Sequence, residues 1–184
     1  MEKREDPNLN FVRKIAENGV VAALYYGLTM LFMLVPVISQ FGPLQCRFSE
    51  ILVLLAFFKP SLIPGLTLGC FLANMTGTLL GQTIALDMLF GTLATLLACL
   101  LEAFFSRFLC VAIIWPCITN GIIVGLELYY LFEGINMPLY ACMGFVALGE
   151  LIVMAVGYAA FMIIIRNRGA MNAMRIEKHA EVKF

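Results

Sequence analysis

Charged residues are scarce in this chain. Only 13% of its 184 residues are Asp, Glu, Lys or Arg, whereas 62% are hydrophobic and the mean hydropathy is +0.94. Soluble domains carry about 25% charged and about 45–50% apolar residues, so the composition excludes an ordinary soluble domain. Positions 60–86 contain 27 consecutive uncharged residues. A run of about 18 or more apolar residues is typical of a bilayer-spanning helix, and we expect an all-α integral membrane protein.

Groups that support several common activities are also missing. The one histidine, His179, lies in the polar C-terminal tail, and the six cysteines form no C-x-x-C pair, so we expect no metal site. There is no G-x-x-x-x-G-K-[ST] phosphate loop, no H-E-x-x-H and no G-x-S-x-G motif. The net charge of zero leaves no basic face for nucleic acid. We expect neither an enzyme nor a nucleic-acid-binding protein, and we expect no cofactor.

Six hydrophobic segments are predicted to form transmembrane helices. They cover residues 20–38, 47–58, 61–80, 85–103, 109–131 and 138–165. The second is short for a bilayer about 30 Å thick at about 1.5 Å per residue, so we expect a partial or tilted helix that other helices bury. The spans form one membrane domain, residues 19–166, with an amphipathic segment at 1–18 before it and a polar tail at 167–184 after it.

An even number of spans places both termini on the same side of the membrane. If that side is the cytoplasm, eleven of the twelve Lys and Arg residues lie inside and only Arg47 lies outside. This is the bias that the positive-inside rule describes, so we predict cytoplasmic termini. A signal peptide is not expected, because the first span follows a long mixed-charge stretch and no clear small-x-small cleavage site precedes Pro36.

Polar side chains within the spans are candidates for function, since charge in the hydrocarbon region is expensive. We single out four acids and two amides at mid-membrane or toward the outside, namely Glu50, Asp87, Glu127, Glu150, Asn74 and Asn120. This distribution favours a cavity open to the outside. Either some acids are protonated there, or a ligand rich in donors or positive charge satisfies them. Two simpler roles stay open, in which Asp87 caps a helix and Glu50 pairs with Arg47.

Small residues recur at every fourth position in two spans. The third span has such a stripe from Gly65 to Gly81, for which we expect packing within the bundle. The first span has Gly19, Ala23 and Gly27, with Ala22 beside them. For this second stripe, internal packing and docking of a partner both stay open.

An ordered set of short motifs runs through these segments. It comprises Gln45-Cys46-Arg47-Phe48-Ser49-Glu50, Pro64-Gly65-Leu66, Gly69-Cys70, Ala73-Asn74, Asp87 leading Phe90-Gly91-Thr92-Leu93-Ala94-Thr95, Pro116 with Asn120, Val124-Gly125 with Glu127-Leu128, and Gly149-Glu150. The set resembles the QueT family, the queuosine-precursor substrate-binding subunits (S-components) of energy-coupling factor (ECF) transporters. The resemblance covers roughly residues 18–166. It departs at Cys46, where an apolar aromatic or aliphatic residue is expected.

The resemblance implies a six-helix S-component-like bundle in a prokaryotic plasma membrane. Such a subunit works with a transmembrane coupling subunit and two cytoplasmic ATPases. The implied substrate is a 7-deazaguanine base, such as queuine or a prequeuosine base. The resemblance also implies that the surface formed by Gly19, Ala22, Ala23 and Gly27 meets the coupling subunit.

The polar residues are chemically compatible with such a base. A guanine-like edge offers a ring N–H and an exocyclic amine, which one carboxylate accepts in bidentate fashion. We predict Glu127 and Glu150 as acceptors for this edge and Arg47 with Glu50 as a pair at the rim of the site. The other predicted contacts are Gln45, Asn74, Asp87 and Asn120. Alternatives are an S-component for another vitamin or nucleobase, a stand-alone proton-coupled carrier and a membrane-embedded enzyme.

Overall fold

The computed structural model describes residues 7–34, 46–132 and 137–166, which contain helices and no strands. Within these ranges, five helices are long and apolar enough to cross a membrane. They are α1 (Pro7–Met33), α3 (Ile63–Leu79), α4 (Asp87–Phe105), α6 (Ile114–Leu131) and α7 (Leu139–Arg166). A short helical turn precedes each of two of them: η2 (Pro60–Leu62) leads into α3 and α5 (Leu109–Ala112) into α6. The chain is therefore an all-helical membrane protein.

The second expected span is a short helix of two parts. A 3₁₀ segment, η1 (Phe48–Leu54), continues into one α-helical turn, α2 (Leu55–Phe58). At about 2.0 and 1.5 Å per residue these parts reach only about 20 Å, which is less than a bilayer core of about 30 Å. Leu54 and Phe57 are at most 1% exposed. The prediction of a partial, buried helix is confirmed, whereas five long spans in the described residues do not amount to the six predicted.

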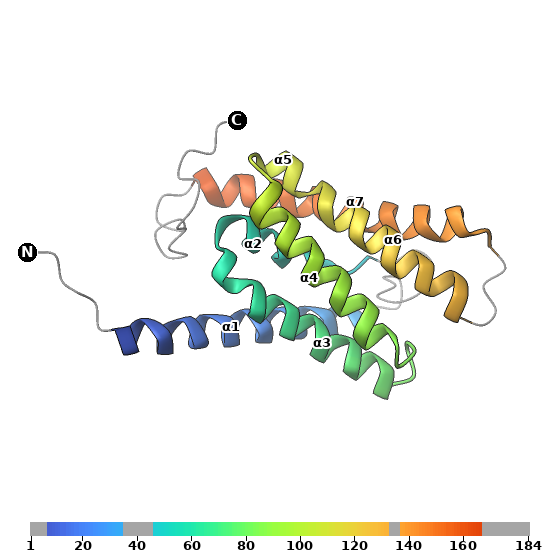
Figure 1. Cartoon of the computed structure of the whole chain (residues 1–184), viewed down its shortest axis with the longest axis horizontal. Helices are drawn as coiled ribbons and strands as arrows, with labels where there is room; N and C mark the ends of the chain where they lie inside the picture. Colours follow the sequence, from blue (N-terminus) through green and yellow to red (C-terminus); the bar gives the residue numbers. More distant parts are fainter. Residues whose placement is uncertain (1–6, 35–45, 133–136, 167–184) are drawn as a thin grey trace, which may run out of the picture.

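The long helices are neighbours in the order α1, α3, α4, α6 and α7 (Figure 1). η1 contacts α1, α4 and α7, so the short helix lies in the interior of the bundle. α1 begins and α7 ends at the same end of the bundle (Figure 1). α1 runs without a break past residue 19, so the predicted amphipathic segment continues directly into the first span.

α1 and α3 approach closely because α3 carries glycine at their contact. A Cβ atom on Gly69 would lie 2.7 Å from Tyr25 Cβ and 2.9 Å from the Ala22 carbonyl oxygen. One turn earlier, the Gly65 N–H donates a 2.6 Å hydrogen bond to Asn18 Oδ1 on α1. The predicted packing of the third-span stripe within the bundle is confirmed at these two glycines.

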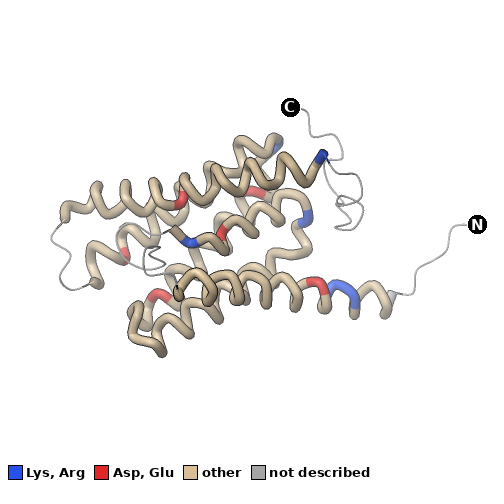
Figure 2. The backbone as a smooth tube through the Cα atoms, turned by 180° about the vertical axis from the view of Figure 1, so that it is seen from behind, with Lys and Arg blue, Asp and Glu red and all other residues tan. Residues whose placement is uncertain are grey.

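The short interior helix is tied to α1 at its C-terminal end. Lys59 follows α2 directly and is 5% exposed. Its Nζ lies 2.8 Å from Glu17 Oε2, and Arg13 Nε lies 3.1 Å from Glu17 Oε1. In Figure 2, basic segments gather where α1 begins and α7 ends, while acidic segments are spread along the bundle.

The turn between α3 and α4 depends on a glycine in the left-handed conformation. Gly81 has φ +68°, its N–H donates to the Thr78 carbonyl at 3.0 Å, and the Gln82 N–H donates to the Gly77 carbonyl at 2.9 Å. This pair of bonds is the Schellman arrangement that ends many helices. The turn returns the chain toward the bundle, and α4 starts at Asp87 with that side chain buried.

Candidate functional site

An ion pair between Arg47 and Asp87 lies inside the bundle. Arg47 directly precedes η1, and its Nη2 is 3.2 Å from Asp87 Oδ2 and 3.4 Å from Oδ1. The two side chains are only 5% and 3% exposed. Thr83, in the turn before α4, donates a 2.9 Å hydrogen bond to Asp87 Oδ2. The alternative that Asp87 caps a helix is wrong, because α4 starts without a side-chain capping bond.

Asn74 on α3 holds the first turn of α4 in place. Its Nδ2 donates to the Asp87 carbonyl oxygen at 3.2 Å and lies 3.5 Å from Cys70 Sγ. Gly91 makes this arrangement possible, since a Cβ there would lie 2.6 Å from Asn74 Nδ2, 2.9 Å from Asp87 Oδ1 and 3.3 Å from Arg47 Nη1. The Asn74 amide nitrogen, predicted as a ligand contact, thus has partners within the protein.

Glu50 faces hydroxyl groups on two helices. The Tyr25 hydroxyl on α1 donates to Glu50 Oε1, and Thr95 Oγ1 on α4 donates to the same oxygen at 3.0 Å. Glu50 is 0% exposed, and its Oε2 has no hydrogen-bond partner among the described residues. The predicted rim pair of Glu50 with Arg47 is wrong, because the ion pair of Arg47 within the described ranges is with Asp87.

Four further interior side chains carry polar atoms without a partner in the part of the chain that the structure describes. These atoms are both side-chain polar atoms of Asn120, both carboxyl oxygens of Glu127 and of Glu102, and Oε1 of Glu150. The four residues are at most 4% exposed. An unsatisfied buried polar group costs about 1–3 kcal/mol, and more if it is charged, so these atoms indicate where a ligand or water completes the bonding.

The four predicted acids lie buried inside the bundle, as does Arg47. Glu50, Asp87, Glu127 and Glu150 are at most 4% exposed, and Arg47 is 5% exposed. The group draws one residue from each of the segments that meet inside the bundle: η1, α4, α6 and α7. Because the interior holds four buried carboxyl groups and one guanidinium, the arrangement can accept a ligand that brings N–H donors or positive charge.

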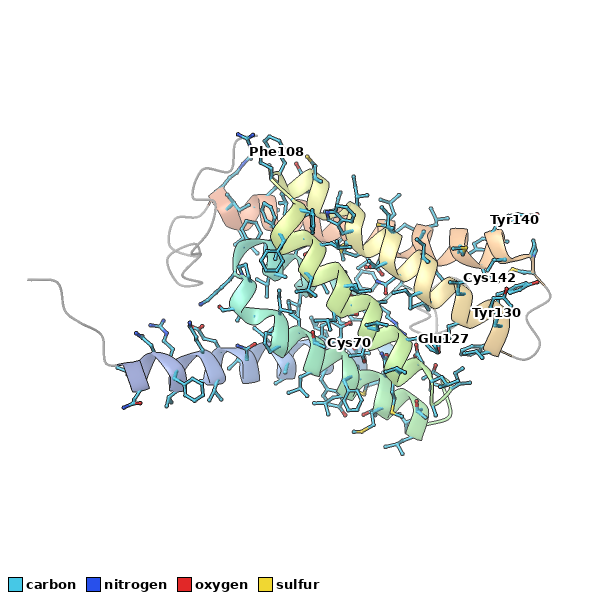
Figure 3. The ribbon with its side chains drawn as sticks, viewed as in Figure 1. Cys70, Phe108, Glu127, Tyr130, Tyr140 and Cys142 are labelled. Carbon is cyan, nitrogen blue, oxygen red and sulfur yellow. The ribbon has the colours of Figure 1, made fainter. Side chains whose placement is uncertain are left out.

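Glu127 is the polar element of an otherwise apolar groove between α4 and α6. Phe90 and Leu93 of α4 and Ile123 and Tyr130 of α6 are among its walls, and its volume is about 360 Å³. Figure 3 shows the labelled Glu127 between these two helices. Its seven-residue spacing from Asn120 places both on one helix face, and both are buried, at 3% exposure.

The small-residue stripe of α1 faces outward. Gly19, Ala23 and Gly27 are exposed, and a Cβ on either glycine would meet nothing within 4 Å. Ala22 differs from them: it is 4% exposed and packs against Gly69 of α3. Docking through this surface stays a prediction for the three exposed residues, and Ala22 is an internal packing residue.

Sequence analysis missed several residues of this interior. Glu102 lies within the predicted fourth span and is 0% exposed, so its position there was an available signal. Cys70 and Thr95 belong to the ordered motif set but, like Tyr25, were not predicted as site residues, because hydroxyl and thiol groups are common in membrane helices. Gln45, also predicted as a ligand contact, lies outside the described residues.

The model of the QueT transporter family matches residues 15–166 of the chain. Comparison with curated proteins and with solved structures gave no match. The matched range covers most of the chain and includes the whole interior group of acids with Arg47. The chain therefore belongs to the QueT transporter family.

Proposed function

We propose that this chain is the substrate-binding subunit of an ECF-type importer and captures a 7-deazaguanine base from outside the cell. Membership of a transporter family and the long apolar helices support transport of a small molecule across a membrane. The observation that carries the proposal is the set of buried acceptor and amide atoms without partners on Glu127, Glu150 and Asn120 within the described ranges.

The chemistry of a 7-deazaguanine base matches these atoms. Its ring N–H and exocyclic amine are donors for one carboxylate, supplied by Glu127 or Glu150. Its carbonyl requires a donor, which the Asn120 amide can provide. A cationic aminomethyl substituent would suit a further acid, such as Glu50. The Asp87–Arg47 pair supports the site from within the protein instead of contacting the base edge.

Ligand identity is tested by titrating the purified protein with queuine and with the aminomethyl prequeuosine base. A ligand that binds only the folded state adds about 2.7 kcal/mol to the free energy of unfolding when its concentration is about a hundred times Kd. This added stability raises the apparent melting temperature. Thiamine, biotin and folate serve as controls. Stabilisation by one of these vitamins, with no response to either deazapurine, would contradict the proposal and favour an S-component for another ligand.

Energy coupling requires partners, because the sequence contains no phosphate loop. We expect the chain alone in proteoliposomes to bind substrate without concentrating it, whether ATP or a proton gradient is supplied. Co-expression with a coupling subunit and two ATPases should permit ATP-dependent uptake. Uptake by the chain alone under a proton gradient would instead support a proton-coupled carrier.

The exposed stripe of α1 is the proposed docking surface for the coupling subunit. Small residues permit close helix approach in a membrane, so Ala23→Leu should block complex formation. Ligand affinity should stay within about twofold of the wild type, because residue 23 faces away from the interior group. Loss of affinity together with complex formation would contradict a docking role.

The proposed orientation places the end where α1 begins and α7 ends in the cytoplasm. Five of the six Lys and Arg residues in the described ranges lie in the first half of α1, in the turns after α2 and α4, or at the end of α7. The sixth is the interior Arg47. This distribution agrees with the positive-inside rule. Labelling of single cysteines introduced at positions 14 and 107 by an impermeant reagent from the outside would contradict it.

A further inference from the structure

Glu50 is held through only one of its two carboxyl oxygens. The hydroxyls of Tyr25 and Thr95 both donate to Oε1, while Oε2 has no partner among the described residues. All three side chains are at most 1% exposed. Because two donors from two different helices meet on one oxygen, the plane of the carboxyl group and the direction of the other oxygen are fixed.

The direction of these hydrogen bonds follows from the neighbouring groups. The Thr95 hydroxyl has a single hydrogen, which it donates to Glu50. Cys70 Sγ on α3 lies 3.2 Å from Thr95 Oγ1 and donates to the Gly91 carbonyl oxygen at 3.8 Å. Hydroxyl groups on α1 and α4 therefore bind one carboxyl group of η1, the interior short helix, and a thiol on α3 contacts the second of them.

A second predicted acceptor in the interior also has a carboxyl oxygen without a partner in the part of the chain that the structure describes. Oε1 of Glu150 on α7 lacks one in the described ranges, and α7 is in contact with η1, which carries Glu50. A purely structural role explains this arrangement poorly, since an apolar side chain would fill the same space without a buried carboxyl group that is only half satisfied. Two acceptors without partners from two elements point to a ligand with more than one donor.

We propose that Tyr25 and Thr95 are positioning residues for ligand binding. By occupying Oε1 of Glu50, they direct Oε2 toward a donor on the ligand. The inference rests on the proposed function, because it treats Glu50 as a ligand contact. It assigns to α1 a role inside the bundle that is separate from the exposed stripe of the same helix.

The test compares matched variants by calorimetric titration with the aminomethyl prequeuosine base. Tyr25→Phe and Thr95→Val each remove one hydroxyl and should weaken binding about tenfold or more, as expected for a hydrogen bond to a charged group. Thr95→Ser keeps the hydroxyl and should stay within about threefold of the wild type. Tyr26→Phe and Thr92→Val are controls on the same two helices: the Tyr26 hydroxyl accepts a bond from Thr76, and Thr92 Oγ1 has no partner in the described ranges.

A second arm separates positioning from general weakening of the fold. In a Glu50→Gln background, Tyr25→Phe should change affinity by less than about twofold, because residues that act through one group are not additive. An unchanged tenfold loss in that background would overturn the inference, and so would wild-type affinity in both Tyr25→Phe and Thr95→Val. If Tyr25→Phe does not fold, the Thr95→Val and Thr95→Ser pair decides the question. No binding of the base by the wild type would overturn the proposed function, and this inference with it.

Discussion

The most direct test of the interior is to remove the charge of Asp87. Asp87→Asn preserves the shape of the side chain and an oxygen to which Thr83 can donate. It takes away the carboxylate that faces Arg47 at 3.2 Å, in a pair whose side chains are 5% and 3% exposed. The guanidinium then loses the carboxylate that faces it in the interior, whereas an exposed ion pair could exchange that carboxylate for water.

The expected loss can be estimated from the burial of the pair. Breaking a buried ion pair by removing one partner costs about 3–5 kcal/mol, while an exposed pair contributes about 0.2–1 kcal/mol. For a chain of this size, 1 kcal/mol shifts the melting temperature by about 2–4 °C. We therefore expect a fall of about 6 °C or more for Asp87→Asn. The matched control is Arg13→Gln, which breaks a pair whose side chains are 36% and 26% exposed and should cost less than about 4 °C.

The measurement is the apparent melting temperature in detergent at low and at high salt. The effect of Asp87→Asn should be nearly the same from about 0.05 to 0.5 M salt, since a buried pair is weakly screened. The double variant Arg47→Gln/Asp87→Asn should recover at least half of the loss, because it removes both charges of the pair. The reasoning is refuted if Asp87→Asn melts within about 2 °C of the wild type, or if the double variant melts lower than the single one.

Three other predictions follow from the interior contacts. Glu150→Gln replaces an acceptor by a donor and should lower affinity for the deazaguanine base at least about tenfold in a calorimetric titration. Its apparent melting temperature should stay near that of the wild type. Normal binding by this variant would show that Glu150 does not contact the ligand. Gly69→Ala should lower the melting temperature, because the added Cβ would overlap α1 at a cost of about 1–3 kcal/mol. Gly27→Ala adds a Cβ in open space and should leave the melting temperature equal or higher. Equal effects of the two variants would contradict the close contact between α1 and α3. Glu102→Met should raise the melting temperature or leave it unchanged, because neither carboxyl oxygen of Glu102 has a partner in the described ranges. A clear fall in the melting temperature would show that this acid has a structural partner.

Local patterns in the sequence predicted the helices and part of the interior well. A helix repeats about every 3.6 residues, so Asn120 and Glu127 could be placed on one face, and both are buried. The length of segment 47–58 was sufficient to predict a partial, buried helix. The four-residue spacing of glycines correctly indicated close packing by α3.

Contacts between distant residues could not be predicted in the same way. Arg47 is three residues from Glu50 and forty from Asp87, yet its ion pair is with Asp87. That choice depends on how η1 and α4 are rotated about their own axes, which spacing along one helix does not specify. The same applies to the Tyr25–Glu50 bond, since only the packing of α1 against the short helix brings that hydroxyl to the carboxyl group.

The short interior helix carries a buried cation at each end, and each cation is paired with an acid on a different long helix. Arg47 pairs with Asp87 at the start of α4, and Lys59 pairs with Glu17 in the first half of α1. The short helix formed by η1 and α2 therefore links α1 to α4 at a fixed distance, although these two helices do not follow one another in the sequence. When α1 or α4 moves, either α1, the short helix and α4 move as one rigid unit, or one of the two ion pairs breaks. A conformational change that separates α1 from α4 must accordingly include the energetic cost of exposing or reburying one of these cations.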